Sequence, residues 1–343
     1  MLPLLNLVSD KLRALPLVVL YITDGCNSRC VTCDIWKLPR RNMSMELVDQ
    51  LAAEFPALGV KQVVLSGGEA MQHPRWQEIA AKFRAVGTKV MLLTNGLFLK
   101  KQAQQVIDFV DALTVSLDGG TAQTYQAIRG VDAFDVILEG VSLIAAGGIP
   151  ITTRTTVQRR NFRELPLIID AAKAAGVGKI SFLAVDTSNH EAFGPRFNDG
   201  SSIPLISVPD YALTADDLPA FAAILERLER DYAADFASGR MAESPQKLRR
   251  LYDYFAAPFE QATFVPPRCN APHISTVIEV DGTIRPCFFL PASGKVGAAG
   301  LKAGLNAAEA VDLRRAYRNG ERSECTRCVC PLYRGPRSLL GLT

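Results

Sequence analysis

The chain has 343 residues, of which 48% are apolar and 21% charged, and its formal net charge is +3. These values are typical of a globular protein with a sizeable core, and they argue against a disordered chain or a nucleic-acid-binding protein. The longest clean apolar run near the N-terminus, residues 15–22, is too short for a transmembrane helix, and no signal cleavage site follows it. We therefore expect a cytoplasmic protein without a membrane segment.

From residue 15 to about 186, strand-like apolar runs alternate with amphipathic helix-like runs. The expected strands cover residues 15–23, 61–67, 88–95, 111–118, 149–157 and 178–186, and they are nearly continuous in apolar residues, as in strands covered on both faces. The expected helices cover residues 45–55, with Ser44 as N-cap, and residues 75–87, 133–148 and 161–178. Repeated strand–helix units predict parallel strands with right-handed crossovers, in a barrel or an open sheet.

The composition changes after residue 186. We expect a long loop at 187–215, helices at 214–236 and 244–257, and a β-hairpin at 273–289 that turns at Asp281-Gly282. This pattern divides the chain into a first unit at 1–215, a helical linker at 216–259 and a small second unit at 260–343.

The eight cysteines fall into two groups, three at residues 26–33 and five at residues 269–330. Tight groups favour metal sites, because the cytosol keeps thiols reduced and available as ligands. Cys26, Cys30 and Cys33 lie on one short loop, which suits an iron–sulfur cluster with one iron left open. A zinc ion with a fourth ligand from elsewhere is the alternative.

Polar residues follow the expected strands where each strand ends. Cys26 follows the first strand, Glu69 the second and Asn95 the third, and Ser116 and Asp118 close the fourth. The carboxyl ends of parallel strands form the edge at which α/β proteins carry out chemistry. The pattern therefore predicts a functional site at this edge.

The sequence "CNSRCVTC" at 26–33 resembles the CxxxCxxC cluster loop of radical S-adenosylmethionine (radical SAM) enzymes. The resemblance continues through "LSGGEA" (65–70), "LLTNG" (92–96) and "VSLDGGTAQTYQAIRG" (115–130). It implies an α/β fold with a partial (β/α)6 TIM-like barrel. It also implies a [4Fe–4S] cluster on Cys26, Cys30 and Cys33 whose open iron binds S-adenosyl-L-methionine. Cleavage by one electron then yields a 5′-deoxyadenosyl radical, which takes a hydrogen atom from the substrate.

The resemblance assigns cofactor-binding roles residue by residue. The family's GGE motif, which meets the methionine ammonium group, matches residues 67–69. Ser116 and Arg154 are expected near the methionine carboxylate, and Asn95 and Asp118 near the ribose or the substrate. The complete predicted set is Gly67, Gly68, Glu69, Asn95, Ser116, Asp118 and Arg154.

The second cysteine group provides four ligands around the expected hairpin. Cys269 and Cys287 bracket the hairpin, and Cys325 and Cys328 form a CxxC pair, which is enough for zinc or for a closed iron–sulfur cluster. The spacing resembles the twitch domain, a shortened SPASM domain with one auxiliary [4Fe–4S] cluster, in a small α+β unit. Cys330 is either an alternative ligand or a free thiol that donates hydrogen.

The resemblance implies a tailoring oxidoreductase that oxidises a small metabolite or short peptide and receives electrons from a flavodoxin or ferredoxin. We expect no leader-peptide-binding domain before the first strand. One alternative is a radical epimerase or crosslinking maturase of a ribosomal peptide. Another is a non-enzymatic scaffold protein whose metal sites are structural.

Overall fold

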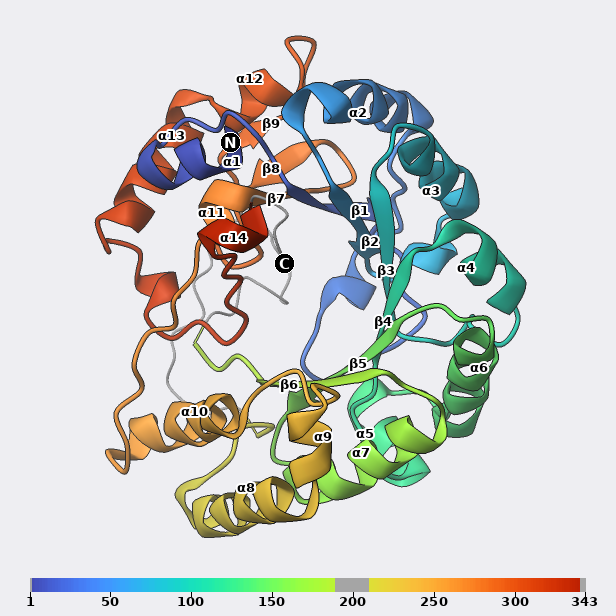
Figure 1. Cartoon of the computed structure of the whole chain (residues 1–343), viewed down its shortest axis with the longest axis vertical. Coiled ribbons are helices and arrows are strands. Elements are labelled where there is room, and N and C mark those ends of the chain that lie inside the picture. Colours follow the sequence, from blue (N-terminus) through green and yellow to red (C-terminus); the bar gives the residue numbers. More distant parts are fainter. Residues whose placement is uncertain (1, 189–209, 340–343) are drawn as a thin grey trace.

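The computed structural model describes residues 2–188 and 210–339, so most of the loop expected at 187–215 lies outside the described residues. Within these ranges the sheet has nine strands in the order β6-β5-β4-β3-β2-β1-β7-β8-β9 (Figure 1). All six strands expected in the first part of the chain are confirmed. The nine strands are β1 (Leu17–Thr23), β2 (Gln62–Gly67), β3 (Lys89–Thr94), β4 (Ala112–Ser116), β5 (Ile151–Val157), β6 (Lys179–Ala184), β7 (Ser275–Ile278), β8 (Thr283–Arg285) and β9 (Gly294–Lys295).

Strands β1 to β6 are parallel and curve into a partial barrel whose helices lie on the outside (Figure 1). The α/β class and the TIM-like partial barrel are therefore confirmed. Ser44 caps the first long helix as expected, since its hydroxyl accepts a hydrogen bond from the Leu47 amide at 3.2 Å. The helices between these strands are α2 (Met45–Leu58), α3 (Trp76–Ala85), α4 (Ala103–Phe109), α5 (Ala122–Arg129), α6 (Phe134–Ala146) and α7 (Leu165–Ala174). Sequence analysis did not identify α4 and α5, which are short.

The inner face of the barrel is more open than the sequence suggested. On β4, Leu113 and Val115 are buried while Thr114 and Ser116 are only half-buried, and the same alternation recurs along β5. The expectation of strands covered equally on both faces was wrong for these two strands. The half-buried positions of these two strands include Ser116 and Arg154, which are register partners.

The hairpin expected at 273–289 is shorter than predicted. Residues 271–274 form the helical turn α11 (Ala271–Ile274), and β7 pairs antiparallel with β8, with Val277 opposite Arg285. Strand β7 also pairs in parallel with β1, with Leu17 opposite Ser275. The C-terminal residues thus extend the barrel sheet instead of forming a separate one. The three-part division of the chain stays a prediction.

The helices expected at 214–236 and 244–257 are present as α8 (Leu218–Asp231), α9 (Ala233–Ala237) and α10 (Pro245–Ala256). Sequence analysis did not identify α12 (Leu301–Leu305), α13 (Ala308–Arg318) and α14 (Pro336–Leu339) in the C-terminal part. Among the residues that the structure describes, no helix has the length and apolar character needed to cross a membrane.

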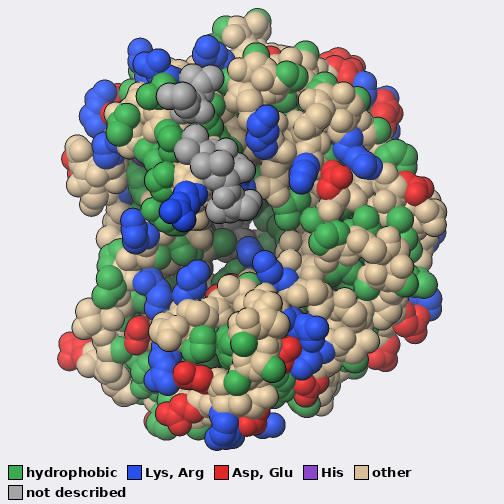
Figure 2. Space-filling model, viewed as in Figure 1, with side chains coloured by type: hydrophobic (Ala, Val, Ile, Leu, Met, Phe, Trp, Pro, Cys, Tyr) green, Lys and Arg blue, Asp and Glu red, His purple; other side chains and the backbone are tan. Residues whose placement is uncertain are grey.

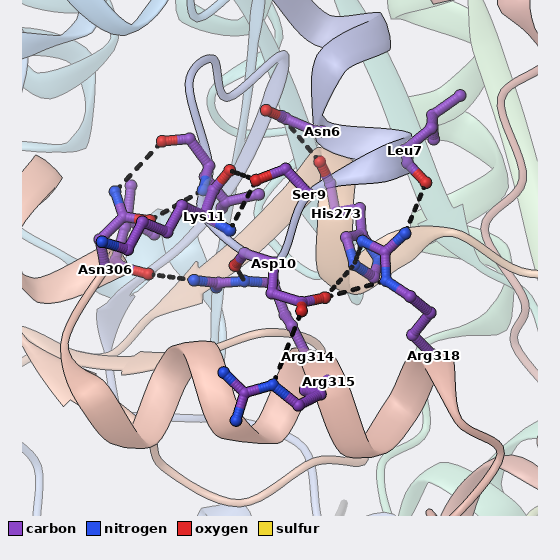
Figure 3. Close-up of polar contacts among 12 residues, drawn as sticks. Asn6, Leu7, Ser9, Asp10, Lys11, His273, Asn306, Arg314, Arg315 and Arg318 are labelled. Carbon is purple, nitrogen blue, oxygen red and sulfur yellow. Dashed lines mark hydrogen bonds and ion pairs between the residues drawn. The ribbon is translucent and has the colours of Figure 1, made fainter.

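The N-terminal segment is fixed to α13 through Asp10 (Figure 3). The Asp10 carboxylate lies 2.9 Å from Arg318 Nε, and Arg314 Nε donates to the Asp10 carbonyl at 2.6 Å. His273 from α11 is buried beside them, and burial together with the neighbouring arginines lowers the pKa of its imidazole to about 4. These contacts join the two ends of the chain on one side of the sheet.

Candidate functional site

The loop that carries Cys26, Cys30 and Cys33 leaves the carboxyl end of β1 and is held against the C-terminal end of α5. The amides of Arg29 and Val31 donate to the carbonyls of Arg129 and Ile128, both at 2.9 Å. Burial raises the pKa of the Cys26 thiol, and it raises the pKa of Cys33 to about 12. These thiols are therefore protonated near neutral pH until a metal displaces the protons.

Two glycines at the end of β2 let the chain lie directly against this loop. Gly67 has a φ of 134°, and a Cβ atom there would come within 2.1 Å of the Thr23 carbonyl oxygen. A Cβ on Gly68 would lie 2.3 Å from the Gly25 carbonyl oxygen. The Gly68 amide donates to Thr23 at 2.8 Å and the Glu69 amide to Gly25 at 2.7 Å. Glycine is thus required by the backbone that leads into Cys26.

The Glu69 carboxylate is buried and fixed by three donors. Thr94 Oγ1 and the Met71 amide donate to Oε1 at 2.8 and 3.1 Å, and the Asn95 amide donates to Oε2 at 2.7 Å. Burial raises the pKa of this carboxyl group, and the three hydrogen bonds oppose that shift. Because a carboxylate offers about four acceptor positions, Oε2 can accept one more donor, such as a ligand ammonium group.

Asn95 lies next to the cysteine loop and donates to it. Its Nδ2 is 2.8 Å from Asn27 Oδ1 and 3.0 Å from Ser28 Oγ, and it lies 3.9 Å from Cys26 Sγ. The predicted ribose or substrate contact of Asn95 is not tested by these distances. Its side chain has a clear structural task, which is to fix the loop from the end of β3.

Arg129 is a site residue that sequence analysis missed. Its Nη1 donates to Cys30 Sγ at 3.3 Å, and its Nε pairs with Asp118 Oδ2 at 2.7 Å. Asp118 Oδ1 in turn accepts from the Thr156 amide at 2.7 Å. Burial is the largest single effect and would lower the pKa of Arg129, but Asp118, Cys30 and Tyr125 together outweigh it and hold that pKa above its ordinary value. A positive charge is thereby maintained beside the cysteine loop.

A local signal for Arg129 was present in the sequence. Thr121 caps α5 by accepting from the Thr124 amide at 3.2 Å, and Tyr125 and Ile128 form its buried face. The capping residue and the three-residue spacing of the apolar side chains are typical of a helix, whose last residue is Arg129. Recognition of this helix would have placed Arg129 at the carboxyl edge of the barrel.

Ser116 and Arg154 are neighbours on adjacent strands, as the predicted carboxylate site requires. They are register partners on β4 and β5, and both side chains are half-buried on the lumen side. Arg154 Nη1 lies 3.9 Å from Cys330 Sγ, while its buried Nε has no hydrogen-bond partner among the described residues. Arg154 therefore lies between the first site and the C-terminal cysteines.

The five C-terminal cysteines lie close enough to influence one another electrostatically. Burial raises the pKa of Cys287 to about 12, and the thiols of Cys269 and Cys325 add to that shift. The Cys328 thiol is affected by both Cys269 and Cys287. Cys330 also acts on Cys328, more strongly than Cys269 and Cys287 do, and it lies 3.9 Å from Arg154 Nη1.

The part of the chain that the structure describes contains no set of three or more His, Cys, Asp or Glu side chains arranged around a single ion.

Comparison with known proteins identifies relatives of the first half of the chain. A model of the radical SAM superfamily matches residues 20–187. An AdoMet-dependent heme synthase of Methanosarcina barkeri is 31% identical over 166 residues, 47% of this chain and 48% of that protein. A probable GTP 3′,8-cyclase of Saccharolobus solfataricus is 30% identical over 172 residues, 47% of this chain and 54% of that protein. The chain spans about half the length of these curated relatives.

Solved structures share the fold over nearly the whole chain. The enzyme anSMEcpe with bound AdoMet superposes with a TM-score of 0.63 at 15% identity, covering 92% of this chain and 89% of that one. SuiB of Streptococcus suis bound to S-adenosylmethionine has a TM-score of 0.60 at 16% identity, covering 92% and 69%. At these identities the likeness shows the fold alone.

Proposed function

We propose that the protein is a radical SAM enzyme, because a model of the radical SAM superfamily matches residues 20–187. It cleaves S-adenosyl-L-methionine reductively to a 5′-deoxyadenosyl radical and abstracts a hydrogen atom from its substrate. The observation that carries this proposal is the contact of one three-cysteine loop with Glu69, Asn95 and Arg129 at the carboxyl edge of the barrel.

A [4Fe–4S] cluster on Cys26, Cys30 and Cys33 supplies the electron and the open iron for the cofactor. The protein holds the cofactor around this position. The remaining acceptor capacity of Glu69 suits the methionine ammonium group, and the Gly67 and Gly68 backbone shapes the turn that presents it. Arg154, whose buried Nε has no hydrogen-bond partner among the described residues, suits the methionine carboxylate together with Ser116.

The two remaining predicted residues support the site through their neighbours. Asn95 fixes the cysteine loop directly, and Asp118 fixes Arg129, which donates to Cys30. We infer that their main task is to position the loop. Because Asn95 and Asp118 both lie near the lumen, we also propose that they contact the ribose or the substrate.

We further propose a twitch-type auxiliary [4Fe–4S] cluster on Cys269, Cys287, Cys325 and Cys328. Such a cluster provides an exit for a second electron and so makes a net oxidation of a small metabolite or short peptide possible. An external one-electron donor such as flavodoxin or ferredoxin would supply the first electron. Two solved structures of this fold, those of anSMEcpe with the Cp18Cys peptide and of SuiB with the precursor peptide SuiA, keep a peptide among the proposed substrates.

A second outcome is favoured by the position of Cys330. Its thiol lies 3.9 Å from Nη1 of Arg154, the residue proposed to bind the methionine carboxylate. A thiol in this place suits hydrogen donation to a substrate radical, which would give an epimer. Crosslinking of a peptide needs no such donor, and a structural scaffold needs neither the donor nor the cofactor site.

The decisive experiment is anaerobic reconstitution with iron and sulfide, reduction, and measurement of 5′-deoxyadenosine after addition of S-adenosyl-L-methionine. We expect the parent protein to form 5′-deoxyadenosine and Cys30→Ala to form none. Val31→Ala, which shortens an exposed side chain of the same loop, is the matched control and should behave as the parent. If the Cys30→Ala protein formed as much 5′-deoxyadenosine as the parent, or if the parent formed none, the enzymatic proposal would be wrong and the scaffold hypothesis would remain.

A further inference from the structure

A cavity of about 570 Å³ lies on the open side of the barrel. It is enclosed by the edge strand β6, the helix α10 and residues 328–333 of the C-terminal segment. Much of its wall is apolar and aromatic, and the rings of Tyr254 and Phe264 meet edge to face with centroids 5.4 Å apart. The other apolar side chains of the wall include Phe182, Leu183, Leu251 and Leu332.

The cavity has a strongly cationic lining. Lys247 and Arg268 are exposed at its mouth, Arg250 is half-buried beside them, and Arg154 lies at the inner end. None of these four cations pairs with a carboxylate of the described residues. In Figure 2, lysine and arginine side chains gather around the hollow at the centre of the face shown.

Two of the cations are already oriented by aromatic groups. The Arg268 guanidinium lies 4.8 Å from the centroid of the Tyr333 ring and donates to the Tyr333 hydroxyl at 3.1 Å. The Arg250 guanidinium lies 5.4 Å from the centroid of Phe264 and donates to the Val265 carbonyl at 2.9 Å. Each guanidinium keeps further donors free, because it carries five N–H groups.

Glu243 is the one acid among the described lining residues, and it does not neutralise the mouth. Its carboxylate accepts from Ser181 Oγ at 2.8 Å and from the Phe182 amide at 2.9 Å, on the strand side of the cavity. Burial raises the pKa of Glu243, while Arg154 acts in the opposite direction. Among the described residues, the mouth cations form no ion pair with a carboxylate, and Arg250 acts on Asp253 only through its charge, which opposes the rise that burial causes in the pKa of that carboxyl group.

We propose that this cavity binds the substrate through an anionic group, a carboxylate or a phosphate, held by Lys247, Arg250 and Arg268. The apolar body of the substrate packs against the aromatic wall, and its far end points toward Arg154 and Cys330. This inference rests on the proposed function, because Arg154 is the register partner of Ser116 in the cofactor site. A substrate held in this way lies between the cofactor site and the C-terminal cysteines.

Four small aromatic probes of matched size test the proposal by calorimetry on the reconstituted protein. Phenylacetate and phenyl phosphate carry the two anionic groups, phenylacetamide is neutral and phenethylamine is cationic. We expect at least one anion to bind about tenfold more tightly than the amide and the amine. The stronger of the two anions identifies the carboxylate or the phosphate as the natural group.

The double variant Lys247→Ala/Arg268→Ala should weaken anion binding about tenfold and leave phenylacetamide binding unchanged. Arg230→Ala/Arg249→Ala removes the same charge from exposed arginines that pair with Asp231 and Glu229, and it should bind as the parent. Equal affinities for anion, amide and amine, tighter binding of the amine, or equal loss in both double variants would overturn the proposal. A separate assay tests the proposed function itself. If the parent protein forms no 5′-deoxyadenosine in the absence of any probe, the proposed function is wrong whatever the probes bind.

Discussion

The guanidinium of Arg129 donates to the sulfur of Cys30 at 3.3 Å from inside the protein, and its charge is balanced by Asp118 at 2.7 Å. A buried charge at this distance acts with less screening than one in water. It favours whichever state of a bound cluster is more negative, which is the reduced state. Arg129 is therefore a positioning residue with an electrostatic effect on the predicted cluster.

Replacement of Arg129 by Gln should lower the midpoint potential of the Cys26–Cys30–Cys33 cluster by roughly 50–150 mV, because the reduced cluster loses a nearby positive charge. The measurement is a redox titration followed by electron paramagnetic resonance. Arg129→Gln/Asp118→Asn removes both charges and should shift the potential less. An unchanged potential in the single variant, with the iron content intact, would contradict the assignment.

Gly68→Ala should destabilise the fold by about 3 kcal/mol or more and reduce cluster incorporation, because its Cβ would overlap the Gly25 carbonyl oxygen at 2.3 Å. Thermal unfolding and iron content measure the two effects. In the control Gly178→Ala the nearest atom lies at an ordinary 3.8 Å, and the change should stay within about 0.5 kcal/mol. Similar unfolding temperatures for the two variants would show that the loop tolerates the added methyl group.

Cys330→Ala should keep both predicted clusters, with about eight iron and eight sulfide ions per chain, whereas Cys328→Ala should keep about four of each. The reason is that Cys328 belongs to the proposed CxxC pair with Cys325, while Cys330 contacts Arg154. Iron and acid-labile sulfide are measured after anaerobic reconstitution. Loss of about four irons from the Cys330→Ala protein would make Cys330 a ligand and remove it as a hydrogen donor.

His273 should make the folded state less stable in mild acid. Its pKa is about 4 in the folded protein and near 6.5 when the chain is unfolded, so between these values the unfolded state binds more protons. Stability is therefore lost as the pH falls through this window, by about 2 kcal/mol between pH 7 and pH 5. Urea unfolding at both pH values measures the change.

In the same experiment His273→Gln should show a pH dependence smaller by about this amount. Comparison of the two proteins at each pH cancels the contributions of other titrating groups. Parallel losses of stability in parent and variant would mean that the imidazole is protonated in the folded state at pH 5.

Several parts of the fold and site were predictable because their signals are local. The six barrel strands follow from runs of apolar residues, and the N-cap of α2 follows from Ser44 itself. The cysteine loop is recognised from three cysteines that lie within residues 26–33. Its resemblance to the radical SAM cluster loop agrees with the family match to residues 20–187.

The sequence by itself predicted parallel strands alternating with helices and a three-cysteine loop after the first strand, because strand periodicity and cysteine spacing are properties of neighbouring residues. The resemblance to radical SAM enzymes chose the barrel over an open sheet. Only the tertiary structure decided that β7 continues the sheet beside β1, that Arg129 lies against Cys30, and that Cys330 lies beside Arg154. Each of these relationships joins segments far apart along the chain. Their contacts depend on how the whole barrel closes, and no local pattern records that.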